Sequence, residues 1–302
     1  MLLAATYLPL IAERAEYLAL LLLPAFGIGE LLARGPFTRA LAALRRAVAT
    51  LGRKLDRDTR PVAVRVYRGL IAVAMLLLPM LAATVFLGRV PPLVALLLLA
   101  WFGQCFATIS NLRLWRAAPG EALRLEQAGE RALFADSHAL LRHYIGTRTE
   151  AFAVGVVGGG FWYVLGGLPA MGVYLALAGA HHAYRARPAF GWAARGAFAL
   201  ADFLPRLLAR GLVFLAGFFT PQTRPFAGLR AKDWQTAVAR TLDITLGGPS
   251  LAGAQEPWVG EGTARLTGLH ARRAVRLLAV AALLLGLLLA GRQMNYILIN
   301  IV

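Results

Sequence analysis

The chain has 302 residues, of which 59% are hydrophobic and only 16% are charged. With a mean hydropathy of +0.62, this composition excludes most soluble domains and is typical of a membrane protein with several spanning segments. The formal charge of +17 would suit a nucleic-acid-binding protein. In so apolar a chain we interpret it instead as cytoplasmic loops that face the anionic headgroups of a lipid bilayer, and we expect no nucleic-acid partner. The single cysteine, Cys105, excludes an intrachain disulfide and a cysteine metal cluster.

The first quarter of the chain predicts one crossing followed by a basic helix. Residues 17–33 form the first apolar membrane segment, and one alternative extends it back to Met1 as a single long helix. Residues 34–68 are strongly basic, and we expect them in the cytoplasm. Between Phe37 and Leu55, apolar residues recur at steps of three and four, as on one face of a helix. This amphipathic helix either lies in the membrane interface or packs, solvated, on the protein's own loops.

The next apolar segments, 69–87 and 93–106, are separated by a tight turn that contains Pro91 and Pro92. Such a short connection predicts an antiparallel pair of membrane helices. Residues 107–150 are polar, of mixed charge and helical in pattern, and we place them in the cytoplasm.

The most informative stretch is 151–180, thirty residues without a formal charge. It is too long for one simple crossing, which needs about 20 apolar residues. It is also interrupted by Gly166-Gly167-Leu168-Pro169, and a break at membrane depth is tolerated only where protein or a polar cavity covers the freed backbone groups. Basic residues follow it in 181–195. We therefore predict a broken, re-entrant or hairpin element, and we expect the protein to do its work here.

The remaining apolar membrane segments are 197–218 and 277–302, and a second polar, cytoplasmic segment, 219–276, lies between them. The predicted fold is all-α: a polytopic helical membrane protein with a Gly-rich re-entrant segment and an interfacial amphipathic helix. Residues 1–302 form a single membrane domain, which we expect in the cytoplasmic (inner) membrane of a bacterium.

Two acids stand out as candidate site residues. Asp202 lies in an apolar segment, where a carboxylate usually faces a polar cavity or a partner. The alternative is a local ion pair with Arg206, one helical turn further on. Glu150 lies at the start of the Gly-rich stretch, either as a ligand of a cation or substrate or as a charge at the membrane boundary. The adjacent His181 and His182 would diverge on a helix, so we predict no metal site there.

Three blocks of residues match a known family in order and spacing almost without gaps. The first is Gly155-Val156-Val157 with Phe161-Trp162, Gly166-Gly167-Leu168-Pro169 and Tyr174; the second is Phe190-Gly191-Trp192-Ala193-Ala194 with Pro205; the third is Leu246-Gly247-Gly248-Pro249 with Glu256-Pro257-Trp258-Val259-Gly260 and Arg272-Arg273-Ala274-Val275-Arg276-Leu277-Leu278. On these blocks, residues 106–278 resemble the CobD/CbiB family of cobalamin biosynthesis, the membrane-embedded adenosylcobinamide-phosphate synthases.

The resemblance implies a reaction, a cofactor and a set of site residues. The family joins adenosylcobyric acid to aminopropanol or its phosphate in an ATP-dependent amide synthesis, which needs carboxylates to hold Mg²⁺ on the nucleotide. It therefore implies Glu150 and Asp202 as the catalytic acids, and Mg-ATP as cofactor if the activity is retained. Gly247, Gly248 and Trp258 become candidate substrate-binding residues. A corrinoid or a phosphorylated small molecule becomes the candidate ligand, and a homo-oligomer is compatible with the sequence.

Most of the family's polar motif residues are replaced in this chain. Its Glu-Asn-x-x-Asp-Gly falls on Glu150-Ala151-Phe152-Ala153-Val154-Gly155, its Asn-Thr-Leu-Asp on Ala178-Gly179-Ala180-His181, its Leu-Asp-Asp followed by Asn on Ala197-Phe198-Ala199 followed by Asp202, and its Ser-Pro-Asn-Ala-Gly on Gly228-Leu229-Arg230-Ala231-Lys232. Replacing a carboxylate by Ala or Phe removes its charge and its coordinating oxygens. We therefore expect a family member with a degraded active site.

Two alternatives are open. AmpE-type membrane proteins, associated with β-lactamase regulation, resemble a stripped version of the same architecture and share an Asp three residues before a proline, as Asp202 precedes Pro205. They imply a non-catalytic regulatory or scaffold protein. An unrelated transporter is supported only by the broken helix and Asp202. We expect Glu150 and Asp202 to face a common polar cavity on the cytoplasmic side.

Overall fold

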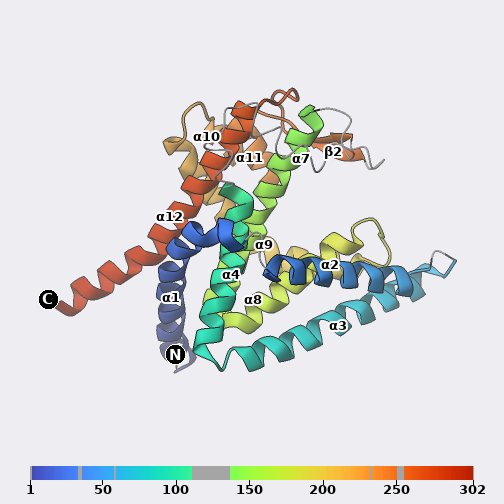
Figure 1. The fold of residues 1–302 in the computed structure, drawn as a ribbon, viewed down its shortest axis with the longest axis horizontal. Helices are drawn as coiled ribbons and strands as arrows, with labels where there is room; N and C mark the ends of the chain where they lie inside the picture. Colours follow the sequence, from blue (N-terminus) through green and yellow to red (C-terminus); the bar gives the residue numbers. More distant parts are fainter. Residues whose placement is uncertain are drawn as a thin grey trace.

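The computed structural model describes residues 2–32, 36–57, 59–110, 137–231, 233–249 and 255–301. The chain is mostly helical in these residues (Figure 1). In chain order the elements are α1 (Leu2–Leu32), α2 (Pro36–Leu55), α3 (Val62–Leu87), α4 (Pro91–Ser110), α7 (Ser137–Glu150), the π-helix η2 (Ala151–Gly158), α8 (Gly159–Tyr184), α9 (Trp192–Phe219), α10 (Pro225–Leu229), α11 (Trp234–Leu242), β1 (Leu246–Pro249), β2 (Gln255–Val259) and α12 (Gly268–Ile301). Residues 111–136, most of one expected cytoplasmic segment, lie outside the described residues.

Three of the described helices are long and apolar enough to cross a membrane. They are Val62–Leu87, His138–Tyr184 and Gly268–Ala290. The alternative that extends the first apolar segment back towards the start of the chain as one long helix is confirmed, since α1 runs from Leu2 to Leu32. Helices α3 and α12 begin before the apolar segments predicted for them, because each continues into flanking residues that include arginines, whose charged ends can reach water. Helix α4 begins two residues early, at Pro91, since proline is favoured in the first turn of a helix.

The predicted break in the Gly-rich stretch is present at Gly167, where φ is 67° and ψ is −160°. The chain folds back at this point, because Gly158 lies against the ring of Tyr174. In a straight helix these two residues would be about 24 Å apart. On α1, Arg14 donates a hydrogen bond of 3.2 Å from Nη1 to the carbonyl of Leu165. One carbonyl next to the break is therefore paired by a side chain of α1, although Leu165 and Gly166 themselves are exposed.

Helix α2 confirms the predicted amphipathic helix and divides its apolar stripe between two environments. Val48 is 6% exposed and packs, with Leu51 and Leu55, in the apolar cluster of α3 and α8. Gly52 lies directly under the ring of Tyr184, where a Cβ would not fit. Leu44, further towards the start of α2, is 48% exposed. The end of the stripe is thus covered by the protein itself, and its earlier part is not.

A buried carboxylate just after α2 joins this end of the helix to α3 and to the residues that follow α8. Asp56, whose side chain is 2% exposed, accepts hydrogen bonds of 2.8 and 3.2 Å from Arg65 of α3. Arg187, beyond the end of α8, lies 3.8 Å from the same carboxylate and donates to the carbonyl of Gly52 at 2.5 Å. In Figure 1 α2 and α3 together form an arm beside α8.

The segment 219–276 contains a feature that an all-α fold does not include. Leu246–Pro249 and Gln255–Val259 form a two-stranded antiparallel sheet, interrupted between Leu246 and Gly248. Gly247 and Gly248 have φ values of 79° and 90°, which favour glycine. Leu246-Gly247-Gly248-Pro249 thus forms a strand, which the predicted all-α fold does not contain. Residue propensities do not predict a strand here, because glycine is depleted in strands.

Candidate functional site

Asp202 lies on the buried face of α9 and is 1% exposed. The hydroxyl of Tyr174 on α8 donates a hydrogen bond of 2.7 Å to its Oδ1. Nε of Arg206, one turn further along α9, donates to Oδ2. The predicted ion pair between Asp202 and Arg206 is therefore confirmed. The side chain of Arg206 is 44% exposed, so the pair joins the protein interior to its surface.

Aromatic rings enclose this pair. Trp162 stacks on Tyr174 with ring centroids 6.4 Å apart, and Tyr174 in turn contacts Phe198 at 5.8 Å. The indole of Trp162 donates a hydrogen bond of 3.0 Å to the carbonyl of Ala201 on α9. Gly158 makes room for the Tyr174 ring because a Cβ would collide with it. The local sequence thus places a glycine of η2, two aromatics of α8 and an acid of α9 in one contact.

Glu150 occupies a different environment. It is the last residue of α7, immediately before η2, and its side chain is exposed. Within the described residues its carboxylate has neither a hydrogen bond nor an ion pair. The structure therefore places one candidate acid inside the protein and the other at its surface. A common cavity for the two stays a prediction.

The arrangement does not fit an Mg-ATP site. A magnesium ion held by protein and nucleotide needs carboxylate oxygens that are open to the ion and its waters. Both oxygens of Asp202 already accept hydrogen bonds, and the residue is almost wholly enclosed. Of the two candidate acids, only Glu150 has a carboxylate that is open to a metal ion. The hydrogen bond from Tyr174 to Asp202 instead holds α8 against α9.

The three candidate substrate-binding residues, by contrast, lie together. A Cβ on Gly248 would come within 2.5–2.9 Å of the ring of Trp258, so the indole lies over this glycine. Trp258 is 56% exposed. Arg142 of α7, itself 6% exposed, has its guanidinium 5.1 Å from the centre of the Trp258 ring. It donates 2.9 Å to the carbonyl of Gly247 and 2.8 Å to that of Ala264.

The histidines are separated from one another. His181 stacks on Phe198 at 5.0 Å, whereas His182 is exposed, as expected for neighbours on a helix. Nδ1 of His138 donates a hydrogen bond of 2.7 Å to the carbonyl of Leu266. In the part of the chain that the structure describes, no three His, Cys, Asp or Glu side chains come together as a metal site would need.

Sequence reasoning missed the roles of Tyr174, Arg142 and Arg14. Tyr174 appears in the first block of the resemblance, but nothing in the sequence pairs it with Asp202, 28 residues away. The carbonyls that Arg142 binds are 105 and 122 residues further along the chain. For Arg142 and Arg14, a charged residue near a predicted apolar segment was the one available signal.

Comparison of the chain with models of known families, with curated proteins and with solved structures gives no match.

Proposed function

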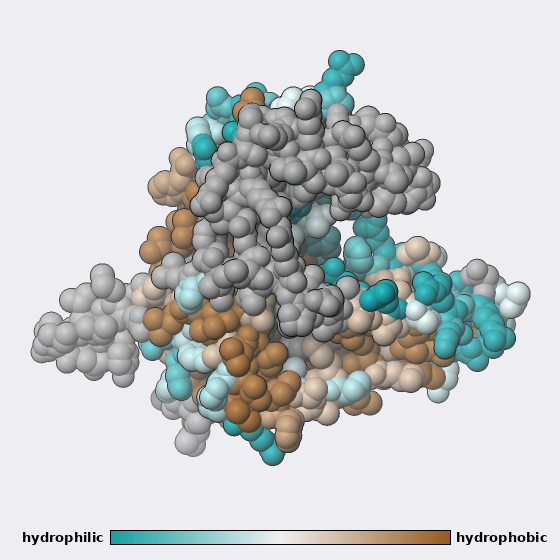
Figure 2. Space-filling view, viewed as in Figure 1, coloured by the Kyte–Doolittle hydropathy of each residue, from teal (hydrophilic) through white to brown (hydrophobic). Residues whose placement is uncertain are grey.

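We propose that this chain is a multi-pass protein of the bacterial cytoplasmic membrane, related to the CobD/CbiB family, which has kept the family scaffold and lost its reaction. The membrane part rests on exposed apolar side chains along helices that the protein does not cover. Leu200 and Phe203 of α9 are 83% and 61% exposed, and Leu78 and Phe86 of α3 are 67% and 70% exposed. Figure 2 shows such hydrophobic residues gathered where α3 meets α4. Apolar surface of this extent is stable against lipid rather than water.

The membrane topology can be tested with single cysteines. In a Cys105→Ala background, one cysteine replaces Arg57, after α2, and another replaces Arg89, in the turn between α3 and α4. An impermeant maleimide should label position 89 from outside intact cells and position 57 only after the cells are opened. Labelling of both from the same side would refute the crossing by α3, and release of the protein by alkaline carbonate would refute membrane insertion.

One observation supports the loss of the reaction: the acid on α9 is used for packing. The Asp202 carboxylate is enclosed and both its oxygens are occupied by Tyr174 and Arg206. The scaffold residues of the same blocks, such as Phe190 and Pro205, are buried. A family member that has lost the Mg-ATP reaction but still folds in the same way would keep these buried packing residues.

Genetic complementation tests the proposal in a cell. A bacterium that lacks its own adenosylcobinamide-phosphate synthase would be supplied with cobyric acid and made to depend on cobalamin. We expect no growth when this chain is expressed in its membrane, and growth when a synthase with all the family motif residues is expressed at the same level. Growth with this chain, lost in Glu150→Gln, would show a rebuilt active site and overturn the proposal.

The AmpE-type alternative, a regulatory or scaffold protein, has one specific observation in its favour. Asp202 and Pro205, the pair shared with that group, both lie on the buried face of α9. An acid used for packing suits a protein that acts through its shape. Under this alternative, the cobalamin intermediates would not bind, whereas under a degraded synthase they would still stabilise the purified protein against heat.

A further inference from the structure

We infer that α9 and α10 form a surface that lies in the membrane interface, with its apolar side chains in lipid and both ends of α9 on the same side of the bilayer. The partner of this surface is the lipid itself. The inference rests on the proposed membrane location and goes beyond it, because it makes α9 a helix that does not cross. In agreement, α9 is not among the three described helices that are apolar enough to span a membrane.

The exposed face of α9 is a continuous apolar stripe. Its large side chains recur at steps of three and four, with the exposed Gly211 in line, and such steps place residues on one side of a helix. They are Leu200, Phe203, Leu204, Leu207, Leu215 and Phe218, which are between 44% and 83% exposed. The buried side of the same helix is smaller and more polar, and includes Asp202, Ala209 and Ala216. A helix with bulky apolar residues outward and an acid inward is suited to lipid rather than water.

Helix α10 widens the stripe at its end. It folds back along α9, so that the ring of Phe226 contacts those of Phe214 and Phe218 with centroids 5.6 and 5.7 Å apart. Nη2 of Arg210 on α9 donates a hydrogen bond of 3.1 Å to the carbonyl of Leu229. Phe226 and Leu229 are 68% and 51% exposed. The apolar surface therefore comes from two helices and continues the face of α9 for which lipid is proposed.

Three arginines lie along one edge of the stripe. Arg195, Arg206 and Arg210 follow one another at steps of eleven and four, and both steps return to nearly the same side of a helix. Each donates a hydrogen bond within the protein, so only the level at which their charges lie is relevant here. A helix in the membrane interface carries basic residues beside its apolar face, at the level of the anionic headgroups.

The two ends of α9 lie on the same side of the turn at Gly167. The chain passes Phe152, turns at Gly167 and returns to Tyr184, which brings Phe152 and Tyr184 to the same side. Helix α9 begins where the backbone of Gly191 lies against the carbonyl of Tyr184. Beyond its other end, α11 packs against α9, and Trp234 stacks on Phe152 with centroids 5.7 Å apart. Figure 1 shows α10 and α11 at the end of the molecule where α7 and α12 begin.

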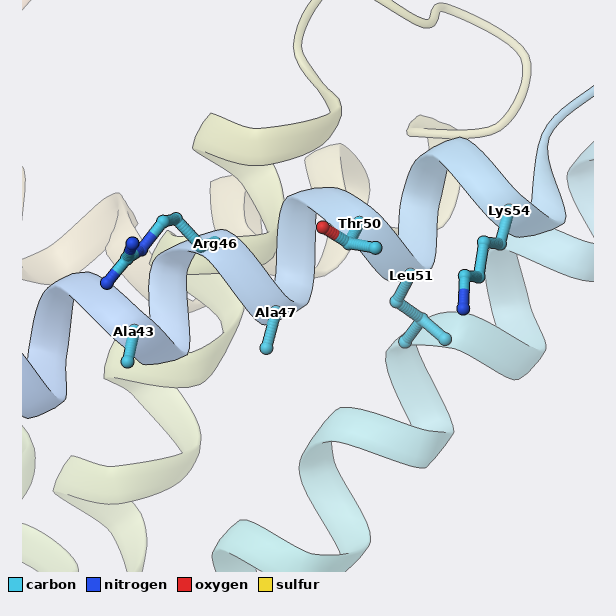
Figure 3. A pocket seen from close by; sticks show the side chains of 6 residues that line it. All are labelled: Ala43, Arg46, Ala47, Thr50, Leu51 and Lys54. Atoms are coloured by element: carbon cyan, nitrogen blue, oxygen red, sulfur yellow. The ribbon is translucent and has the colours of Figure 1, made fainter.

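The groove of about 550 Å³ along α2 offers no comparable surface (Figure 3). It is lined by that one helix. Figure 3 shows Leu51 pointing from α2 towards α3, and this side chain packs in the apolar cluster of α3 and α8. Arg46, a basic residue of the groove, already has a partner. The stripe on α9 and α10 needs only exposed apolar side chains, and these are present on both helices.

Single cysteines at the two ends of α9 test its path. In the Cys105→Ala background, Ala186→Cys lies in the turn before α9 and Pro221→Cys lies just after it, and both positions are exposed. We expect an impermeant maleimide to label both from the same side of the bilayer as position 57. Labelling from opposite sides would make α9 a crossing and overturn the inference. Failure of the proposed membrane location shows separately, as release of the whole protein by alkaline carbonate.

Spin labels measure the depth of the same surface. In the same background, the full chain would carry a nitroxide on Leu204→Cys or Phe226→Cys of the stripe, and would be reconstituted in vesicles of phosphatidylglycerol and phosphatidylethanolamine. Ala199→Cys is the control, since position 199 is exposed and lies four residues from Arg195, on the arginine edge. We expect the ratio of collisions with oxygen to collisions with a water-soluble nickel chelate to be severalfold higher at 204 and 226 than at 199. This ratio corresponds to burial by about 5–10 Å in the boundary between headgroups and acyl chains.

Two results would overturn the inference. Equal access of the nickel chelate to all three positions would leave the stripe in water. Low collision rates with both reagents at 204 and 226 would show that a protein partner, and not lipid, covers the stripe.

Discussion

The contact around Asp202 and the β1–β2 hairpin around Trp258 both join a charged side chain to aromatic rings, but they use it differently. At the first, the charged group is enclosed: Asp202 is 1% exposed and both its oxygens are occupied. At the second, the charged Arg142 is buried and holds up an indole that is 56% exposed. The first arrangement fixes two helices to each other, and the second presents an aromatic surface. An acid within an apolar helix therefore need not mark a binding surface, and the more exposed cluster is the better place for a ligand.

The largest effect is expected at the enclosed contact. Asp202→Ala leaves the hydroxyl of Tyr174 buried without an acceptor and removes the partner of Arg206, at a cost of about 3 kcal/mol. Thermal unfolding of the purified protein in detergent would measure the loss. Glu150→Ala is the matched control, since its carboxylate is exposed, and should change stability by less than about 0.5 kcal/mol. Equal losses in the two variants would contradict the difference in burial.

At the hairpin, Arg142→Ala should cost about 2 kcal/mol, because two backbone carbonyls lose a charged donor. The effect should be local. Hydrogen exchange followed by mass spectrometry should become faster in 246–249 and 255–259 and stay unchanged in α8 and α9. Arg265→Ala, at an exposed arginine near the hairpin, serves as control. If exchange also rose in α8 and α9, the hairpin would not be separable from the helical body.

Two glycines allow a sharper test of the close contact between η2 and Tyr174. Gly158→Ala places a methyl group against the tyrosine ring and should destabilise the protein by about 2 kcal/mol. Gly146→Ala, in α7, meets nothing within 4 Å and should be neutral or stabilising by up to about 1 kcal/mol. A Gly158→Ala protein as stable as Gly146→Ala would show that α8 does not fold back onto η2 as described.

The smallest change in stability is expected for Trp258→Ala, below about 1 kcal/mol, because the indole is more exposed than buried. Its denaturation midpoint should lie close to that of the unaltered chain, and Arg142→Ala should lie well below both. If Trp258→Ala were as damaging as Arg142→Ala, the indole would be a packing residue and not a presented surface.

The fold could be predicted from the sequence where local pattern decides it. The lengths of the apolar segments predict the long helices, and the spacing of apolar residues at three and four predicts α2. The sequence Gly166-Gly167-Leu168-Pro169 predicts the break at Gly167. The cover of that break by Arg14 could not be predicted, since it joins residues 151 positions apart. The β1–β2 pair was missed because two glycines with positive φ conceal a strand.

The candidate site was predicted in its residues and only partly in its geometry. The pair of Asp202 and Arg206 follows from one helical turn of separation. The hydrogen bond from Tyr174 depends on how α8 folds back, and Arg142 reaches the hairpin from a different helix. Local spacing cannot supply contacts of that kind, which depend on tertiary packing.

The central claim, that the scaffold persists without the reaction, is tested most directly by a turnover assay on the purified protein. The detergent-solubilised chain would receive Mg-ATP, adenosylcobyric acid and aminopropanol phosphate, and the amide product would be measured by mass spectrometry beside a homologue with all the family motif residues. We predict product from the homologue and none from this chain. Product from this chain that disappears in Glu150→Gln would contradict the account and show that a single exposed acid sustains the chemistry.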